Sequence, residues 1–333
     1  MSQLRNKQSK EACLEDVKNE DFKRISISFY RYANIENPDA LRDELYRTWQ
    51  AIGVLGRIYL AKEGINAQLS IPKHQQKTFR KHIDSFPFFK NVPFKIGLEE
   101  KTISFWKLAI KVRDYILADG LPDGSYDLNN VGKHLSAEEF NEAMGSDETI
   151  VVDMRNAYES VIGHFKGAVK PRSNTFREEL PMVAKELKGN EEKKILLYCT
   201  GGIRCEKTSA FLKDKGFKDV NQLEGGVINY VHQVKTKKLE TKFIGENFVF
   251  DGRRGETVTD DLLGTCMNCE TATNDYTDCN NKACHVMFLQ CEACGKKMDG
   301  CCSAVCKEIS SLPAEVQKEM RRGRKTKFAE KAC

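Results

Sequence analysis

The sequence predicts a multidomain protein in which an α+β part and an α/β part precede a cysteine-rich segment. Residues 24–118 carry strand and helix patterns in the order β-α-β-β-α-β, and residues 136–240 alternate apolar strands with helices. Ten of the thirteen cysteines lie at or beyond Cys266. A chain of 333 residues is also longer than one hydrophobic core usually serves, so two or three domains are expected.

The first domain is expected over residues 24–118. "ISISFYRYA" has the pattern of a strand, and "NPDALRDELYRTWQAIG" has helical spacing of its apolar residues. "GRIYLAKEGINAQLSI" suggests two short strands around "KEG", and the proline of "PKHQQKTFRKHIDSF" suggests a helix start. "PFKIGLEEKTISFWKLAIKVRD" closes the domain with strand-like alternation. This order predicts a ferredoxin-like, two-layer α+β sandwich.

The second domain is expected over residues 136–240, after a turn-rich linker at 119–135. Apolar strands are predicted at "TIVVDMR", "KKILLYC" and "VNQL", and helices at "SAEEFNEAM", "LPMVAKELKG" and "EKTSAFLKDKG". Apolar strands that alternate with helices predict a mostly parallel sheet covered on both faces. In such sheets, sites form at the carboxyl ends of the strands.

The two ends of the chain are polar. No apolar run approaches the ~18–20 residues of a membrane span, so no membrane contact is predicted. Residues 1–23 lack the apolar core of a signal peptide and are expected to form a flexible leader of a cytoplasmic protein. The net charge is only +5, but residues 313–333 form a basic tail that contains "RRGRKTK". Such a run is usually solvated, and the alternative is a phosphate-binding arm.

The turn after "KKILLYC" is the predicted reactive site. Cys199 ends the strand, and a helix begins within a few residues. Amides of the connecting loop can turn inward and form an anion nest, and a nest at a helix N-terminus lowers the pKa of a thiol. The residues of this nest are Thr200, Gly201, Gly202 and Ile203. Arg204 adds a cation, so a thiolate or an anionic sulfur carried on it is expected.

Loop length separates the candidate chemistries. A cysteine-dependent phosphatase needs five residues between its cysteine and arginine, whereas four separate Cys199 from Arg204. The shorter loop favours sulfur chemistry over phosphate chemistry. A buried spectator cysteine is less favoured, because two glycines and an arginine follow directly.

The same region resembles a rhodanese domain. Cys199 matches the usual sulfur-accepting cysteine by loop position, and "EGG" at 224–226 matches the closing motif of that family. Cys205 falls where most relatives have serine, so either cysteine could be the functional one, and the pair could also form a persulfide-resolving disulfide. The family's "D-x-R" and "GH" motifs supply three supporting residues: Asp153, Arg155 and His164.

A narrower resemblance covers the chain from about Arg24 to about Arg322. "AKEGINAQ", "CTGGIRCEK" and "FIGENFVFDGRRGE" resemble the oxygen-dependent tRNA uridine(34) hydroxylase (TrhO) family. The resemblance implies that the protein binds the anticodon loop of tRNA and uses molecular oxygen to convert the wobble uridine to 5-hydroxyuridine. Two alternatives remain, a rhodanese-type sulfurtransferase that uses a cysteine persulfide and a non-catalytic, zinc-stabilised RNA-binding adaptor.

A covalent route can link the cysteine to this reaction. A thiolate or persulfide at Cys199 or Cys205 could add to C6 of uridine, which makes C5 enolate-like and reactive toward oxygen. Either Phe29 or Tyr30, on opposite faces of the first strand, could stack a base. The candidate contacts to tRNA phosphates are Lys62, Arg113, Arg172, Arg177, Arg204, Arg253, Arg254 and the basic tail.

Residues 241–312 are expected to bind zinc. Two C-x₂-C pairs, interleaved with further cysteines, fit tetrahedral zinc sites. Eight thiols would fill two closed, structural sites: Cys266, Cys269, Cys279, Cys284, Cys291, Cys294, Cys302 and Cys306. Grouping the first four against the last four and a crossed arrangement are both open, and His285 is a possible substitute ligand. An iron–sulfur cluster is the second option, and disulfides are the third.

Overall fold

A computed structural model describes residues 4–98 and 102–322 of the chain. Its N-terminal part is built around a five-stranded sheet in the order β4-β1-β3-β2-β5. Its elements are β1 (Arg24–Tyr32), α2 (Pro38–Ala51), β2 (Leu55–Ala61), β3 (Gly64–Pro72), the 3₁₀ turns Lys73–Gln75 and Pro87–Phe89, α3 (Gln76–Asp84), β4 (Lys95–Ile96) and β5 (Leu108–Val112). The antiparallel order β4-β1-β3-β2 with two helices confirms the ferredoxin-like prediction.

The closing segment of this part differs from the expectation. Instead of one strand it forms β4 and then β5, and β5 joins the sheet edge parallel to β2. The chain leaves the sheet after β4 because the backbone amide of Leu98 donates to the Glu256 carboxylate, 2.9 Å away, in the C-terminal part. The prediction of a single closing strand was therefore wrong, because the backbone after β4 is hydrogen-bonded to a segment that is distant in the sequence.

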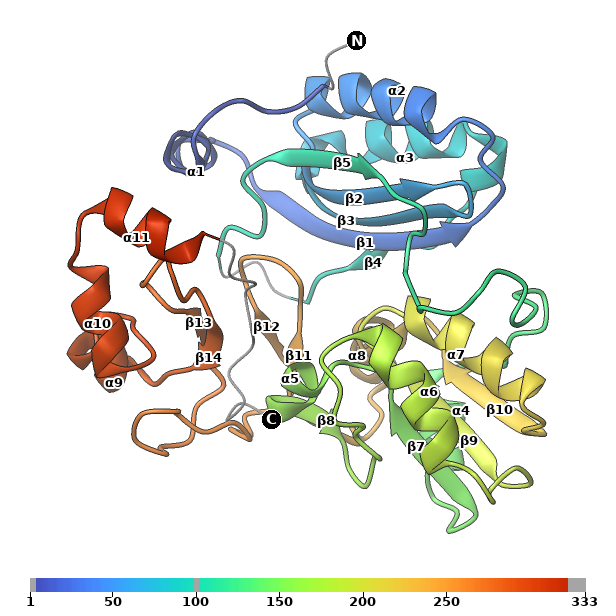
Figure 1. Cartoon of the computed structure of the whole chain (residues 1–333). Coiled ribbons are helices and arrows are strands. Elements are labelled where there is room, and N and C mark those ends of the chain that lie inside the picture. Colours follow the sequence, from blue (N-terminus) through green and yellow to red (C-terminus); the bar gives the residue numbers. More distant parts are fainter. Residues whose placement is uncertain (1–3, 99–101, 323–333) are drawn as a thin grey trace.

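The two faces of this sheet have opposite character. Ile27 and Phe29 of β1 join the hydrophobic core beneath α2 and α3, with Trp49 and Phe79 from those helices. Alternate residues of β1, such as Ser28, point to the other face. Figure 1 shows α2 and α3 on one side of the sheet and the middle and C-terminal parts of the chain on the other. The polar face is therefore available to form a site.

The middle part contains a four-stranded, fully parallel sheet in the order β6-β10-β9-β7. Its elements are β6 (Lys133–Leu135), α4 (Ala137–Ala143), β7 (Thr149–Asp153), α5 (Ala157–Val161), β8 (Gly163–Phe165), α6 (Phe176–Glu186), β9 (Lys194–Tyr198), α7 (Ile203–Asp214), β10 (Asp219–Leu223) and α8 (Gly226–Lys237). Ile195 packs with Leu180 and Leu212 of α6 and α7, while Leu196 packs with Phe140 and Val231 of α4 and α8. The predicted parallel sheet with both faces covered is confirmed.

The C-terminal part begins as an extension of the middle part. Strand β11 (Phe243–Phe248) pairs antiparallel with β8 and with β12 (Gly255–Thr257). The remaining elements are β13 (Tyr276–Asp278), β14 (Met287–Leu289), α9 (Glu292–Lys297), α10 (Ala304–Ser310) and α11 (Ala314–Arg321). The cysteine-rich segment is thus anchored by a sheet whose first strand lies about eighty residues earlier in the chain.

The ends of the chain are more regular than expected. Helix α1 (Lys10–Lys18) has Ser9 as its N-cap and buries Cys13, so the flexible-leader expectation was wrong for these residues. Most of the basic tail, residues 323–333, lies outside the described residues. Within the described ranges, no helix has the length and apolar character that crossing a membrane requires.

A fully buried ion pair joins β7 to the following turn. The Arg155 guanidinium donates to both Asp153 carboxylate oxygens at 2.8 and 2.7 Å and to the Gly163 carbonyl at 2.6 Å. The Tyr198 hydroxyl also donates to Asp153 at 2.7 Å. The predicted supporting pair therefore connects β7, β8 and β9 at the carboxyl ends of β7 and β9.

Arg155→Met should destabilise the protein strongly, because Asp153 would remain buried without its cation. Breaking such a pair costs about 3–5 kcal/mol, so the midpoint of thermal unfolding should fall by about 10 °C or more. The control is Lys194→Met, which removes the exposed partner of Asp219 and should leave the midpoint almost unchanged. Equal midpoints for the two variants would contradict this role for Arg155.

Candidate active site

The loop of residues 199–204, here called the cysteine loop, connects β9 to α7. Cys199 follows the last residue of β9, and Ile203 begins the helix. The first amides of α8 hold the loop from the other side: Val227 N–H donates to the Cys199 carbonyl at 3.0 Å and Ile228 N–H donates to the Thr200 carbonyl at 3.2 Å. The cysteine loop therefore lies at the carboxyl edge of the parallel sheet, where the sequence predicted a site.

Two glycines permit this close approach. Gly226 has φ +67°, and a Cβ there would lie 2.4 Å from the Cys199 carbonyl oxygen. Gly202 has φ +101°, and a Cβ there would lie 2.9 Å from the Tyr30 hydroxyl. The "TGG" and "EGG" motifs thus contribute to one packed unit of loop and helix.

The two cysteines of this region differ in protonation. Burial opposes ionisation of Cys199, but a hydrogen bond from Cys205, the Arg204 charge and the amides of Arg204 and Gly202 together lower the pKa of its thiol to about 5. The Gly202 amide nitrogen lies 3.1 Å from the Cys199 sulfur. Burial and the neighbouring Cys199 raise the pKa of Cys205 well above its ordinary value. These opposite shifts favour the thiolate form of Cys199 and the protonated form of Cys205 as its donor.

Arg204 is held by a carboxylate that the sequence reasoning missed. Its guanidinium donates to the two Glu159 oxygens at 2.5 and 2.9 Å, and the Thr200 hydroxyl donates to Glu159 at 3.1 Å. Glu159 also caps α5 through the backbone of Asn156, and this "NAYE" capping box was its only signal in the sequence. Arg204 is therefore fixed by a buried ion pair, although its charge still acts on Cys199.

A cavity of about 450 Å³ separates the cysteine loop from the polar face of the N-terminal sheet. Its lining includes four residues of that sheet face (Ser28, Tyr30, Asn66 and Gln68), Lys95, five residues of the cysteine loop (Cys199, Thr200, Gly201, Ile203 and Arg204) and two aromatic residues from other segments (Phe176 and Phe250). The volume lies within the range of about 300–1,000 Å³ that small-molecule sites occupy. All three parts of the chain thus contribute to one cavity.

Several predicted site residues lie outside this cavity. Cys205 lies behind the cysteine loop, and Asp153 and Arg155 form the buried pair described above. His164 is engaged elsewhere, with Nδ1 2.9 Å from the Ser160 carbonyl and Nε2 3.1 Å from the Lys170 ammonium. The structure therefore gives these residues surroundings typical of structural support.

Polar contacts close the boundary between the N-terminal and middle parts. The Tyr30 hydroxyl donates to Glu206 at 2.8 Å, whereas Phe29 is buried in the core. Lys207 of α7 lies 3.2 Å from both Glu63 and Asp119. The base-stacking candidate of the first strand is consequently Tyr30, whose position is set by a residue of the middle part.

The basic residues proposed to contact tRNA fall into two groups, and the first, which includes Arg204 with Glu159, is held in ion pairs. Arg253 pairs with Asp251 and Glu256, and Arg254 pairs with Asp278. The second group is exposed and, within the described residues, has no ion pair: Lys62, Arg113, Arg172 and Arg177.

Comparison with known proteins identifies the family. A protein from Leptospira interrogans named tRNA uridine(34) hydroxylase is 52% identical over 321 residues, which cover 96% of this chain and 88% of that protein. A protein of the same name from Photorhabdus laumondii is 45% identical, covering 90% of this chain and 86% of its own length. The chain belongs to the tRNA uridine(34) hydroxylase family. The resemblance drawn from the sequence is confirmed.

Family models match three regions of this chain. Residues 24–116 match a "UPF0176 acylphosphatase like domain", residues 136–233 match a "Rhodanese-like domain", and residues 244–307 match "Rhodanase C-terminal". The fold predicted from the sequence agrees with these matches in kind and order.

The cysteine-rich part of this chain contains two groups of four thiols. One group is Cys266, Cys269, Cys291 and Cys294, and the other is Cys279, Cys284, Cys302 and Cys306. Within each group all sulfur atoms lie within 4.8 Å of one another. Of the two groupings left open by the sequence, the crossed one is correct, and His285 belongs to neither group.

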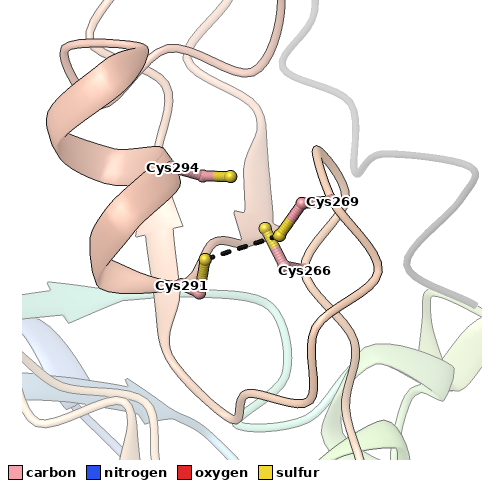
Figure 2. A group of neighbouring side chains, drawn as sticks. All are labelled: Cys266, Cys269, Cys291 and Cys294. Carbon is pink, nitrogen blue, oxygen red and sulfur yellow. Dashed lines mark hydrogen bonds between the residues drawn. The ribbon is translucent and has the colours of Figure 1, made fainter.

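The first group joins two separate turns. Figure 2 shows Cys266 and Cys269 on a loop and Cys291 and Cys294 at the start of α9, with the four sulfur atoms directed toward a common centre. The sulfurs of Cys269 and Cys291 are 3.6 Å apart. Together, the two distant C-x₂-C motifs of this chain form a site that could hold a metal ion. Four thiols would fill a tetrahedral coordination sphere and leave no position open for another ligand.

Alkylation should reveal the ionisation of Cys199. Because its pKa is lowered to about 5, the thiolate is present above that pH and is lost below it. Iodoacetamide labelling of the Cys199 peptide, followed by mass spectrometry between about pH 4 and pH 9, should therefore reach its plateau near pH 6. Cys205→Ala should shift the rise in Cys199 labelling to higher pH, because Cys199 loses a hydrogen-bond donor. The control Cys13→Ala replaces a remote buried cysteine and should leave the labelling profile unchanged. A rise in Cys199 labelling centred near pH 8.5, the ordinary pKa of a thiol, would exclude a stabilised thiolate.

Proposed function

We propose that this chain hydroxylates uridine 34 of tRNA at C5 with molecular oxygen and that Cys199 is its nucleophile. Family membership supports the reaction, and the observation that carries the assignment is a thiolate beside a base-sized cavity. The wobble base would have to leave its stack, which costs little in an anticodon loop. Inside the cavity, the side-chain amides of Asn66 and Gln68 offer polar partners for the uracil edge, and Tyr30 offers a ring.

In the proposed chemistry, the Cys199 thiolate forms a bond to C6 while the C5=C6 electron pair moves toward C4 and O4. The enolate carbon C5 then reacts with oxygen. One oxygen atom replaces the hydrogen at C5, and the other leaves as water after taking two electrons from a thiol reductant. Loss of the C5 proton to solvent then breaks the sulfur–C6 bond, which releases Cys199 as a thiolate and restores the double bond. Cys205 remains protonated and donates to Cys199 between turnovers.

The anticodon loop would approach along the exposed basic residues. Arg113 follows β5 and its amide donates to the Leu60 carbonyl of β2 at 2.8 Å, so Arg113 and Lys62 lie at neighbouring strand ends. Arg172 and Arg177 flank the start of α6, on the middle part. These four cations are proposed as phosphate contacts, because the structure leaves their charges unpaired within the described residues.

Zinc is the proposed metal of both cysteine groups. Four thiolates at a zinc–sulfur distance of about 2.3 Å place their sulfurs about 3.8 Å apart in a tetrahedron. The sulfur distances Cys284–Cys302 and Cys302–Cys306 are 3.8 and 3.5 Å, which fits this geometry. When bound, the metal would stabilise the fold of a segment with few apolar contacts.

Replacing the two reactive-site cysteines should give unequal losses. Cys199→Ser should abolish hydroxylation of uridine 34, measured by mass spectrometry of tRNA nucleosides, because serine is not ionised at neutral pH. Cys205→Ala should keep part of the activity and lose most of it at low pH, where the Cys199 pKa becomes limiting. Full activity in Cys199→Ser would exclude the covalent route.

Metal analysis should find two zinc ions per chain, one in each group of four cysteines. Cys266→Ser and Cys284→Ser should each lower the zinc content to about one ion. Cys301→Ser is the matched control, because Cys301 is buried in the same segment but belongs to neither group. Stoichiometric iron in place of zinc, with visible absorption, would overturn the assignment.

A further inference from the structure

Lys95 is a buried cation that borders the cavity and has no assigned role. It begins the edge strand β4 and stands opposite Ser28 of β1, so its side chain shares the polar face of the sheet. Its side chain is only 7% exposed, and it lies 3.8 Å from the position that a Cβ on Gly201 would occupy. Lys95, from the N-terminal sheet, and Cys199, from the cysteine loop, therefore line the same cavity.

The Lys95 ammonium lacks an anionic partner of its own. Its nitrogen lies 4.1 Å from the centroid of the Tyr30 ring, and within the described residues it forms no hydrogen bond or ion pair. Glu206, a carboxylate whose charge acts on Lys95, already accepts from Tyr30 and Gln222 at 2.8 and 3.0 Å and lies 3.0 Å from the His134 ring nitrogen. An ammonium on a largely buried side chain, with no ion pair of its own, is stabilised when an anion or a polarised oxygen arrives with the ligand.

We propose that Lys95 is a catalytic residue that donates a hydrogen bond to O4 of the uracil ring while Cys199 adds to C6. This inference rests on the proposed function and assigns the group that stabilises the developing charge. As the sulfur–C6 bond forms, the C5=C6 electron pair moves to C5, C4 and O4, and the ammonium proton of Lys95 hydrogen-bonds to the resulting enolate oxygen. No electron acceptor is needed in this step, because the electron pair stays within the ring until oxygen reacts.

The environment also suits Lys95 to this role. Burial lowers its pKa to about 8, and the charges of Cys199 and Glu206 oppose that shift. The charged or titratable groups around it are Tyr30, Arg31, His134, Cys199, Glu206, Glu224 and His232. A donor with a pKa close to the working pH is efficient in general acid catalysis. Addition should require the Cys199 thiolate and the Lys95 ammonium together, so the rate should be highest between about pH 5 and about pH 8.

Two assays on an anticodon stem–loop RNA test this role. In aerobic buffer, mass spectrometry measures 5-hydroxyuridine at position 34. In anaerobic deuterium oxide, reversible addition to C6 exchanges the hydrogen at C5 for deuterium, which isolates addition from the oxygen step. Lys95→Met should lower both rates by about 100-fold. It should also remove the alkaline limb, which is the fall in the rate of deuterium exchange above about pH 8. The control Lys111→Met removes an exposed lysine from β5, the opposite edge strand, and should match the wild type.

Lys95→Arg keeps the charge without titrating near pH 8, so its alkaline limb should disappear while activity exceeds that of Lys95→Met. Circular dichroism verifies that each variant is folded. The role of Lys95 is overturned if Lys95→Met is within about twofold of the wild type or if the wild-type profile has no alkaline limb near pH 8. If the wild type neither hydroxylates nor exchanges while Cys199 still alkylates as a thiolate, the proposed function itself fails.

Discussion

The stabilisation of one buried thiolate is the constraint on which the other features of the site depend. Burial alone would keep Cys199 neutral, yet the Gly202 and Arg204 amides, the Arg204 charge and the Cys205 thiol reverse that preference. The donors converge only because the cysteine loop folds tightly against the N-terminus of α8, where Gly226 leaves no room for a side chain. Local backbone geometry therefore selects which of two neighbouring cysteines is ionised.

The cavity is built by more than the middle part of the chain. A parallel α/β unit alone would present Cys199 at an open sheet edge. Here the polar face of the N-terminal sheet covers that edge, and Tyr30 and Lys95 come from its strands β1 and β4. Contacts such as Lys207 with Glu63 fix the two parts against each other. Cys199 and Lys95, which both line this cavity, are themselves buried, so charges and hydrogen bonds act on them more strongly than in solvent.

The C-terminal part uses a different means to hold its shape. Crossed cysteine groups connect turns that are far apart in sequence, and β11 ties the segment to β8. The same part reaches back to the cavity, since Phe250 lines it and Glu256 captures the backbone after β4. The three parts of the chain are consequently interdependent around the site.

The sequence alone determined the main strands and helices of the first two domains, the position of the reactive turn and the eight cysteines of the two groups. These features depend on local spacing: alternation in "SISFY", glycines after "LLYC" and repeated C-x₂-C pairs. Only the tertiary structure decided that Cys199 rather than Cys205 carries the charge, that Glu159 holds Arg204, that Lys95 faces the sulfur and that the cysteine groups cross. Each of these depends on contacts between residues distant in the chain, because hydrogen bonds, burial and ligand distances are set by packing.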